Sequence, residues 1–243
     1  MNEQVIKVNN LDLKFKTYSF DNLIAGYNIG KEVNYHTDLI TTQKVLKEFA
    51  LTGKPLKITP EHKDNVLIDS DKEPTDAIIS TKREVIILSP ADCIGLVLID
   101  TISGNYGLCH IGRAGVGYNI VEKFIKRFLE VQPNESYDLK FVISPNIDPE
   151  NYPHNSDAFI YNDGQPNWWF NNQELLNKKN DTFFPDLEKA VIKQINESEL
   201  IKEKFEIISS GLSTYTSDMH SNSRDTKEGI EEKRRNIVFV GLK

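Results

Sequence analysis

Four short apolar runs follow one another closely in the middle of the chain, with little but turn residues between them. They are rich in isoleucine, leucine and valine, and they cover residues 76–80, 85–88, 94–99 and 106–111. Short apolar runs bounded by Gly, Pro, Asn, Asp and Ser are typical of β-strands. Ser103-Gly104-Asn105 separates the last two runs and favours a hairpin. The centre of the chain therefore predicts a sheet of closely connected strands.

Helical patterns and further strand signals surround this region. Residues 38–50 have an amphipathic spacing, with Thr37 as the expected N-cap and Asp38 at the positive end of the helix dipole. Helices are also predicted at residues 119–130 and 186–196. An alternating segment predicts a hairpin at residues 5–16, and shorter strands are expected at residues 56–58, 65–68, 140–143, 205–209 and 237–240. Because no repeat or linker interrupts the pattern, we expect one α/β domain over residues 1–243.

Composition excludes several classes of protein. Hydrophobic residues make up 39% and charged residues 27% of the 243 residues, which is typical of a globular protein. The net charge of −7 argues against a nucleic-acid-coating surface, which needs a concentrated basic face. Neither a signal peptide nor an apolar stretch of about twenty residues is present, so no membrane span is expected. Two cysteines and no sign of export favour the cytoplasm, whereas the oligomeric state cannot be read from the sequence.

Cys93 and His110 lie where a site is expected at one end of the predicted hairpin. Cys93 directly precedes the strand at residues 94–99, and His110 lies at the end of the paired strand. The hairpin brings both side chains within reach of each other, next to a glycine-rich turn that leaves room for a ligand. A thiolate with imidazoles can bind zinc and leave one position open. Without a metal, the same pair can act as nucleophile and base. Spacing alone does not choose His62 over His154 as a further partner.

The glycine-rich turn and two arginines are candidates for binding an anionic substrate. Gly112, Gly115 and Gly117 precede the helix at residues 119–130, where backbone N–H groups can cradle a phosphate. A tight strand-to-helix turn explains the same glycines without any ligand. Arg113 in this turn and Arg224 near the C-terminus are predicted to hold an anionic group. Cys109 is expected to be a small core residue.

An ordered series of short motifs resembles the laccase-domain family, also called polyphenol oxidase or peptidoglycan editing factor. The family pattern runs Gln-Val-His-Gly, Thr-Asp-Ala, Thr-Ala-Asp-Cys and His-Ala-Gly-Trp-Arg-Gly. The corresponding stretches here begin at Glu61, Thr75, Pro90 and His110, and further ones begin at Tyr27, Ser213 and Ser221. The resemblance extends over nearly the whole chain, and the order and spacing of the motifs make it specific.

This resemblance implies a layered α/β/β/α sandwich related to the Cys–His hydrolase fold. It also implies that His62, Cys93 and His110 form the zinc-binding or catalytic triad, and it adds Asn28 to the substrate-binding candidates. The family's Trp-Arg is Arg113-Ala114 here, and its double arginine near the C-terminus is reduced to Arg224. The expected substrate-binding groups are therefore altered more than the triad.

Three functions are expected from these residues together with the resemblance, which implies the purine-nucleoside and cell-wall activities. The first is a zinc-dependent enzyme that acts on purine nucleosides, by phosphorolysis or adenosine deamination, or on a related small nucleotide-like substrate. The second is a metal-free amide hydrolase that edits a peptidoglycan precursor, with Cys93 as nucleophile and His110 as base. The third is a zinc-stabilised binding protein without turnover. A multicopper centre is not expected, because five histidines without a His-x-His pair supply too few imidazole ligands.

Overall fold

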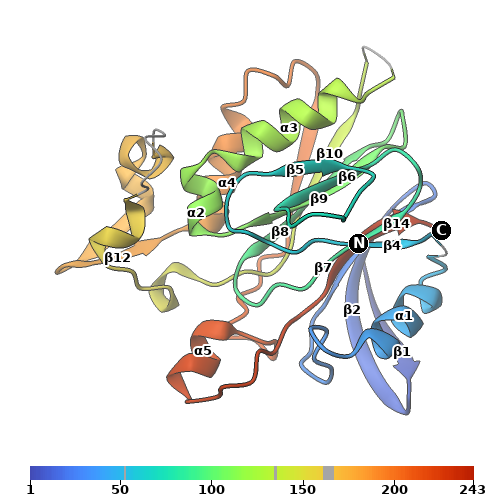
Figure 1. Ribbon diagram of the computed structural model, residues 1–243, viewed down its shortest axis with the longest axis horizontal. Helices are drawn as coiled ribbons and strands as arrows, with labels where there is room; N and C mark the ends of the chain where they lie inside the picture. Colours follow the sequence, from blue (N-terminus) through green and yellow to red (C-terminus); the bar gives the residue numbers. More distant parts are fainter. Residues whose placement is uncertain (52, 134–135, 161–166) are drawn as a thin grey trace.

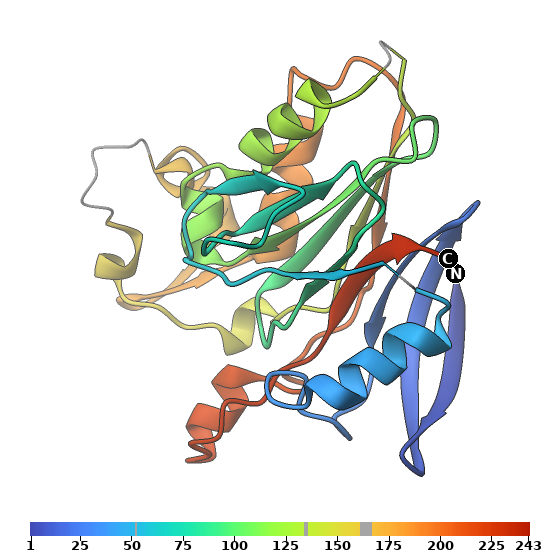
Figure 2. The same cartoon turned by 45° about the vertical axis from the view of Figure 1, so that its right-hand side comes forward.

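The computed structural model describes residues 1–51, 53–133, 136–160 and 167–243. Within them, two six-stranded sheets pack face to face, and helices cover the outer face of each sheet (Figure 1). In Figure 2, helix α1 lies over one sheet, whereas helices α3 and α4 lie over the other. Their bounds are Leu39–Glu48, Ile120–Glu130 and Leu187–Asn196. The expected α/β/β/α sandwich is therefore confirmed.

The first sheet is built from both ends of the chain, which lie together in both views (Figures 1 and 2). Its strands, in spatial order, are β1 (Asn2–Val8), β2 (Leu11–Phe20), β3 (Leu23–Asn28), β14 (Val238–Leu242), β7 (Val85–Leu88) and β4 (Pro55–Lys57). Only β4 and β7 pair in parallel among these neighbours. The carboxyl ends of β4 and β7 therefore meet the beginning of β14 at one edge of the sheet.

The second sheet contains the predicted central hairpin. Its strands, in spatial order, are β13 (Phe205–Ser209), β10 (Leu139–Ile143), β8 (Ile94–Asp100), β9 (Tyr106–Ile111), β6 (Ala77–Ser80) and β5 (Val66–Ile68). Strands β8 and β9 pair antiparallel over their whole length. The remaining elements are a two-stranded hairpin, two short α-helices and several 3₁₀ turns: β11 (Leu176–Lys179), β12 (Thr182–Pro185), α2 (Arg113–Gly117), α5 (Asn222–Lys227), Pro149–Asn151, Ser156–Phe159, Trp168–Asn171 and Gln173–Leu175.

Alternation along the strands assigns each side chain to a layer. In β9, Tyr106 and Leu108 join the cluster between the two sheets, whereas Cys109 joins the cluster under α3 and α4. Phe124 of α3 is fully buried in the second of these clusters. By the same period of two, His110 faces the space between the sheets. The side chain of His110 therefore points into the interior at the end of the hairpin.

Most predicted elements are present, and the differences have local causes. The hairpin at residues 5–16 is confirmed, with Asn9 and Asn10 both in the left-handed region at φ 50° and 66°. The expected N-cap Thr37 is wrong, because the carboxylate of Asp38 accepts the N–H of Thr41 and caps α1 itself. Sequence patterns missed β3, β11, β12 and the two short helices. Within the described residues, no helix combines the length and apolar character needed to cross a bilayer.

Candidate metal centre and cleft

Cys93 and His110 come together because of the register of the central hairpin. Ile94 pairs with Ile111 and Gly95 pairs with His110 across strands β8 and β9. Cys93 lies two residues before Gly95 and therefore on the same face of the sheet as His110. Because Gly95 has no side chain, nothing from β8 stands directly opposite the imidazole. The sequence prediction that the hairpin brings these two side chains together agrees with this register.

Gly112 allows the thiol of Cys93 to approach the main chain. A Cβ atom at this position would lie 2.9 Å from the Sγ atom of Cys93, closer than real Cβ contacts. Any larger residue would displace the sulfur or the turn that leads into α2. This glycine is therefore required by the close approach of the thiol, independently of any phosphate.

His62 reaches the same point from a strained turn in a distant part of the chain. Its backbone lies in the left-handed region at φ 61°, which costs roughly 1–2 kcal/mol for a residue with a side chain. The carboxylate of Asp76 offsets this cost by accepting the backbone N–H groups of His62 (3.0 Å) and Lys63 (2.9 Å). The same carboxylate accepts from Nδ1 of His110 at 3.1 Å. Asp76 thus joins the turn of His62 to the strand of His110.

His62, Cys93 and His110 form a compact group of metal-type ligands. One ligand atom from each residue lies within 4.8 Å of the other two. The two imidazole rings meet edge to face, with centroids 4.8 Å apart and an interplanar angle of 82°. His62 is exposed, Cys93 half-buried and His110 buried, so the group is open on the side of His62. Because Asp76 occupies Nδ1 of His110, the Nε2 atom of that ring is the one left for a ligand.

Without a metal, the group forms a thiolate–imidazolium pair. Burial alone would raise the pKa of the Cys93 thiol. The charge of His110 and hydrogen bonds from His110 and His62 outweigh burial and lower that pKa to about 6. Burial would conversely lower the pKa of His110, but the Cys93 thiolate and Asp76 raise it to about 9. Burial raises the pKa of Cys109 well above its usual range, so only Cys93 is a reactive thiol.

Asp76 is a positioning residue that the sequence analysis did not select, although it stands in the Thr-Asp-Ala motif. Replacing it by Asn keeps the size of the side chain but allows the amide to present an N–H to Nδ1. We expect Asp76→Asn to weaken zinc binding by about 10–100-fold, the usual effect of losing a carboxylate behind a metal-binding histidine. Competition with a chromogenic chelator measures this loss. Asp64→Asn, which changes a surface carboxylate that pairs with Lys123, should bind zinc like the wild type.

The group lies in the wall of an open cleft with a volume of about 1180 Å³. Several parts of the chain border the cleft, among them the turn around Pro60, the segment around Tyr152, helix α5 and the segment that precedes β14. Gly112 and Arg113, two of the residues predicted to bind substrate, also border it. The guanidinium of Arg113 lies over the ring of Phe159, with its central carbon 5.4 Å from the ring centroid.

Two other candidates for substrate binding, Gly115 and Asn28, lie outside the cleft wall. Gly115 is buried within α2 and is not part of the cleft wall. Asn28 is buried and bonds to the carbonyl of Gly30, to the side chain of Asn236 and to the N–H of Ile237. These contacts join β3 to the start of β14, so Asn28 supports the fold of this region.

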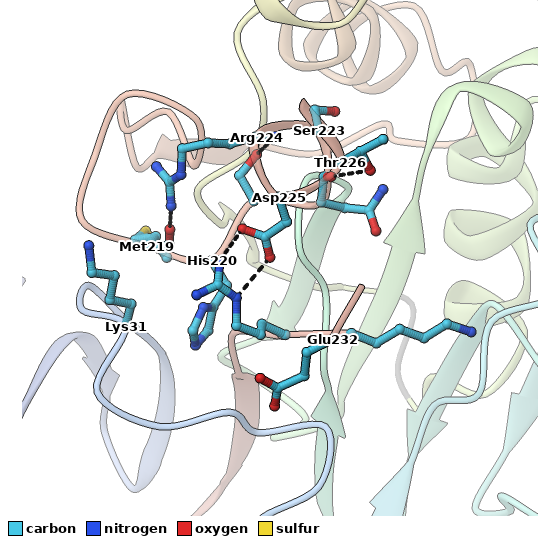
Figure 3. A network of polar contacts seen from close by, with 12 residues as sticks. Lys31, Met219, His220, Ser223, Arg224, Asp225, Thr226 and Glu232 are labelled. Carbon is cyan, nitrogen blue, oxygen red and sulfur yellow. Dashed lines mark hydrogen bonds and ion pairs between the residues drawn. The ribbon is translucent and has the colours of Figure 1, made fainter. Parts of the chain in front are cut away.

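Arg224 also differs from its predicted role of gripping an anion. Its guanidinium donates to the carbonyl groups of Tyr215 (2.7 Å) and Ser217 (3.0 Å), and also to that of Met219 (Figure 3). These acceptors belong to a loop that precedes α5, and Arg224 does not border the cleft. A guanidinium saturated by main-chain carbonyls holds the loop in place. Asp92 gives further support, because its carboxylate accepts from Thr214 and from the N–H of Ser223.

The structure also separates the remaining histidines from the metal-type group. His154 borders the cleft, but its ring stacks edge to face on Tyr152 with centroids 4.3 Å apart. His220 is buried and bonds through Nε2 to the carbonyl of Val33 at 3.0 Å. His36 is exposed at the edge of the cleft. Within the described part of the chain, His62, Cys93 and His110 are the group of three or more His, Cys, Asp or Glu side chains placed to share a metal ion.

The fold and this group define the chain as an α/β/β/α sandwich protein with one cysteine and two histidines at a cleft. A family model described as multi-copper polyphenol oxidoreductase laccase matches residues 20–237. The chain therefore belongs to this family, as the resemblance indicated. A search of curated proteins gave no match.

Solved structures of bacterial proteins share the fold over nearly their whole length. The hypothetical protein YfiH from Bacillus licheniformis is 17% identical, with a TM-score of 0.74 over 93% of this chain and 94% of that one. YlmD from Geobacillus stearothermophilus is 15% identical, with a TM-score of 0.70 over 92% and 93%. Protein NMB0706 from Neisseria meningitidis is 15% identical, with a TM-score of 0.71 over 94% and 98%. At these identities, the likeness shows the shared fold.

Proposed function

We propose that this protein is a zinc-dependent enzyme that acts on purine nucleosides, by phosphorolysis or by deamination. One observation carries the proposal: ligand atoms of His62, Cys93 and His110 lie within 4.8 Å of one another in the wall of a cleft of about 1180 Å³. A cleft of this size accommodates a small organic substrate next to the group. Membership in the laccase family supports an enzymatic role for this site.

The donor set fits zinc. One thiolate and two imidazoles are common zinc ligands, and three protein ligands leave one position open, as in catalytic sites. Zinc held in this way supplies a Lewis acid next to the substrate. The chemistry of the donors is unlike that of a multicopper centre, which needs several more imidazoles. The other three histidines lie outside the group, which supports zinc rather than the copper of the family's name.

The surrounding residues prepare the site for a polar substrate. Asp76 holds the proton of His110 at Nδ1 and keeps the ring in one orientation. Gly112 leaves space for the thiolate of Cys93. Arg113, next to that glycine at the cleft, is placed to donate to phosphate in the phosphorolysis reaction, where phosphate attacks the sugar carbon. In deamination, water attacks the purine ring and ammonia leaves.

A panel of nucleosides tests the proposal. Purified protein is stripped with a chelator, reloaded with zinc or copper, and incubated with adenosine, inosine and guanosine with and without phosphate. Chromatography of the products should show the free base with phosphate, or inosine formed from adenosine, only after zinc loading and not with His110→Ala. Failure of zinc-loaded protein to convert any nucleoside would contradict the proposal. Ligand-induced thermal stabilisation without product would instead identify a zinc-stabilised binding protein.

The thiolate–imidazolium pair favours metal-free amide hydrolysis, for instance on a peptidoglycan precursor, as a second candidate. Because the pKa of Cys93 is lowered to about 6, its thiolate predominates above that pH in metal-free protein. We expect alkylation by iodoacetamide to rise through pH 6 and level off near pH 7–8. An ordinary thiol would keep gaining reactivity through pH ~8.5. Cys109, which is fully buried, serves as the internal control and should stay unmodified by mass spectrometry.

Zinc separates the two candidate functions. Bound zinc should protect Cys93 from alkylation, because the ligand sulfur is no longer free to attack. Activity that survives chelation and is lost on alkylation would support the amide hydrolase. Activity that disappears on chelation and returns with zinc would support the nucleoside enzyme.

A further inference from the structure

The cleft carries an excess of positive charge although the protein as a whole is acidic. The net charge of the chain is −7. Five Lys or Arg residues border the cleft against two acidic ones: Lys57, Arg113, Lys227, Lys233 and Arg235 against Asp92 and Glu150. The carboxylate of Asp92 is already used by Thr214 and Ser223. A local reversal of sign in an acidic protein attracts and holds anions.

Three of these cations form one side of the cleft, which we call the cationic wall: Lys57, Lys233 and Arg235. Lys57 ends β4, and the other two lie in the segment that leads into β14. The parallel pairing of β4 with β7 and the antiparallel pairing of β7 with β14 bring these ends to one edge of the sheet. The backbone of Arg235 bonds to Asn34 (3.0 Å) and to Tyr35 (3.1 Å), next to His36.

The three side chains of the basic run at residues 233–235 have two different environments. Arg234 pairs with Asp225 of α5 through both carboxylate oxygens (Figure 3). Lys233 and Arg235, on either side of Arg234 in the sequence, border the cleft. In the described part of the chain, no carboxylate lies within 4 Å of the side-chain nitrogens of Lys57, Lys233 or Arg235. Asp71 is close to Lys57, but it accepts from the backbone N–H of that residue at 3.3 Å. The ion pair of Arg234 therefore holds two uncompensated cations in the wall.

We propose that the cationic wall binds the phosphate group of a phosphorylated substrate, so that the protein acts on nucleoside monophosphates in preference to neutral nucleosides. This inference rests on the proposed function and specifies its substrate class. A phosphate accepts charge-assisted hydrogen bonds from lysine and from the fork of an arginine, and it relieves the repulsion among the three cations. The cleft of about 1180 Å³ has room for both the nucleoside and its phosphate.

His36 provides independent support that these charges converge. Burial and then the charges of Arg235, Lys57 and Lys233 lower the pKa of this imidazole. The neutral ring remains able to donate one N–H to an anion at the edge of the cleft. His36 belongs to the loop before α1, so this imidazole and the cationic wall border the cleft from three separate backbone segments.

Calorimetric titration of the zinc-loaded protein with adenosine 5′-monophosphate and with adenosine tests the inference. We expect the monophosphate to bind at least about tenfold more tightly, the effect of one charge-assisted hydrogen bond. Lys233→Gln and Arg235→Gln should each lower the affinity for the monophosphate about tenfold, whereas the affinity for adenosine should stay unchanged. Lys7→Gln is the matched control, because it removes the same charge from β1, at the opposite edge of the sheet from β4. Zinc content and melting temperature of each variant establish that it is folded.

The outcomes separate this inference from the proposed function. Equal affinity of the wild type for monophosphate and adenosine overturns the inference, whereas turnover of adenosine would still support the proposed function. A different result would be that inorganic phosphate binds as tightly as the monophosphate through the same residues, while the monophosphate binds no better than adenosine. That result would assign the cationic wall to a free anion and would also overturn the inference. If the zinc-loaded wild type turns over neither nucleosides nor nucleotides, the proposed function is contradicted, even if monophosphate binding depends on Lys233 and Arg235.

Discussion

Replacing His62 by Ala is expected to lower zinc affinity by roughly 100–1000-fold and to remove zinc-dependent activity. Structural zinc sites with four ligands bind with about 10–16 kcal/mol, so each ligand contributes on the order of 2.5–4 kcal/mol, which corresponds to roughly this loss. Cys93→Ala and His110→Ala should have effects at least as large, because both residues are more buried than His62. Metal analysis after dialysis against a weak chelator measures the stoichiometry, which should fall from about one zinc per chain towards zero.

His154→Ala is the matched control for this experiment. His154 borders the same cleft, but its ring packs on Tyr152 and it does not belong to the metal-type group. We expect this variant to retain zinc at the level of the wild type. Zinc retained by His62→Ala, or lost equally from His154→Ala, would contradict the assignment of the ligands.

The comparison of His62 with Cys93 and His110 shows what sequence could predict about the site. Cys93 and His110 lie on two strands joined by a short turn, so local pairing alone brings them together. His62 lies 31 residues before Cys93, in a left-handed turn that is held by Asp76, the residue just before β6. No spacing rule for a single sequence describes that contact, so only the family resemblance selected His62.

The substrate side of the cleft was harder to predict for a related reason. Arg224 was expected to bind an anion, but nearby carbonyl groups saturate its guanidinium. No sequence pattern assigned the basic run at residues 233–235 to the site, whereas two of its three side chains border the cleft. Whether an arginine binds main chain, carboxylate or ligand depends on tertiary partners. Whether a segment such as β8 forms a strand depends mainly on its own residues, so strands of this kind could be predicted from the sequence.

The ion pair between Asp225 and Arg234 is expected to stabilise the segment that carries Lys233 and Arg235 of the cationic wall. Asp225 is buried, and the side chain of Arg234 is 25% exposed. Removing one partner of a buried pair costs about 3–5 kcal/mol. Because Arg234 is partly solvated, we expect Asp225→Ala to lower the free energy of unfolding by about 2–3 kcal/mol. For a protein of this size, the melting temperature should fall by roughly 4–12 °C in calorimetry.

A double-variant cycle separates the ion pair from simple loss of packing. Asp225→Leu with Arg234→Met removes both charges and keeps apolar volume, so it should be more stable than Asp225→Leu alone, which leaves Arg234 without its carboxylate. Equal stability of the single and the double variant would show that the charges are not coupled. We expect both variants to bind adenosine 5′-monophosphate more weakly than the wild type and to retain zinc. The reason is that the ion pair positions Lys233 and Arg235, whereas the metal-type group is held by the hairpin of β8 and β9 and by Asp76.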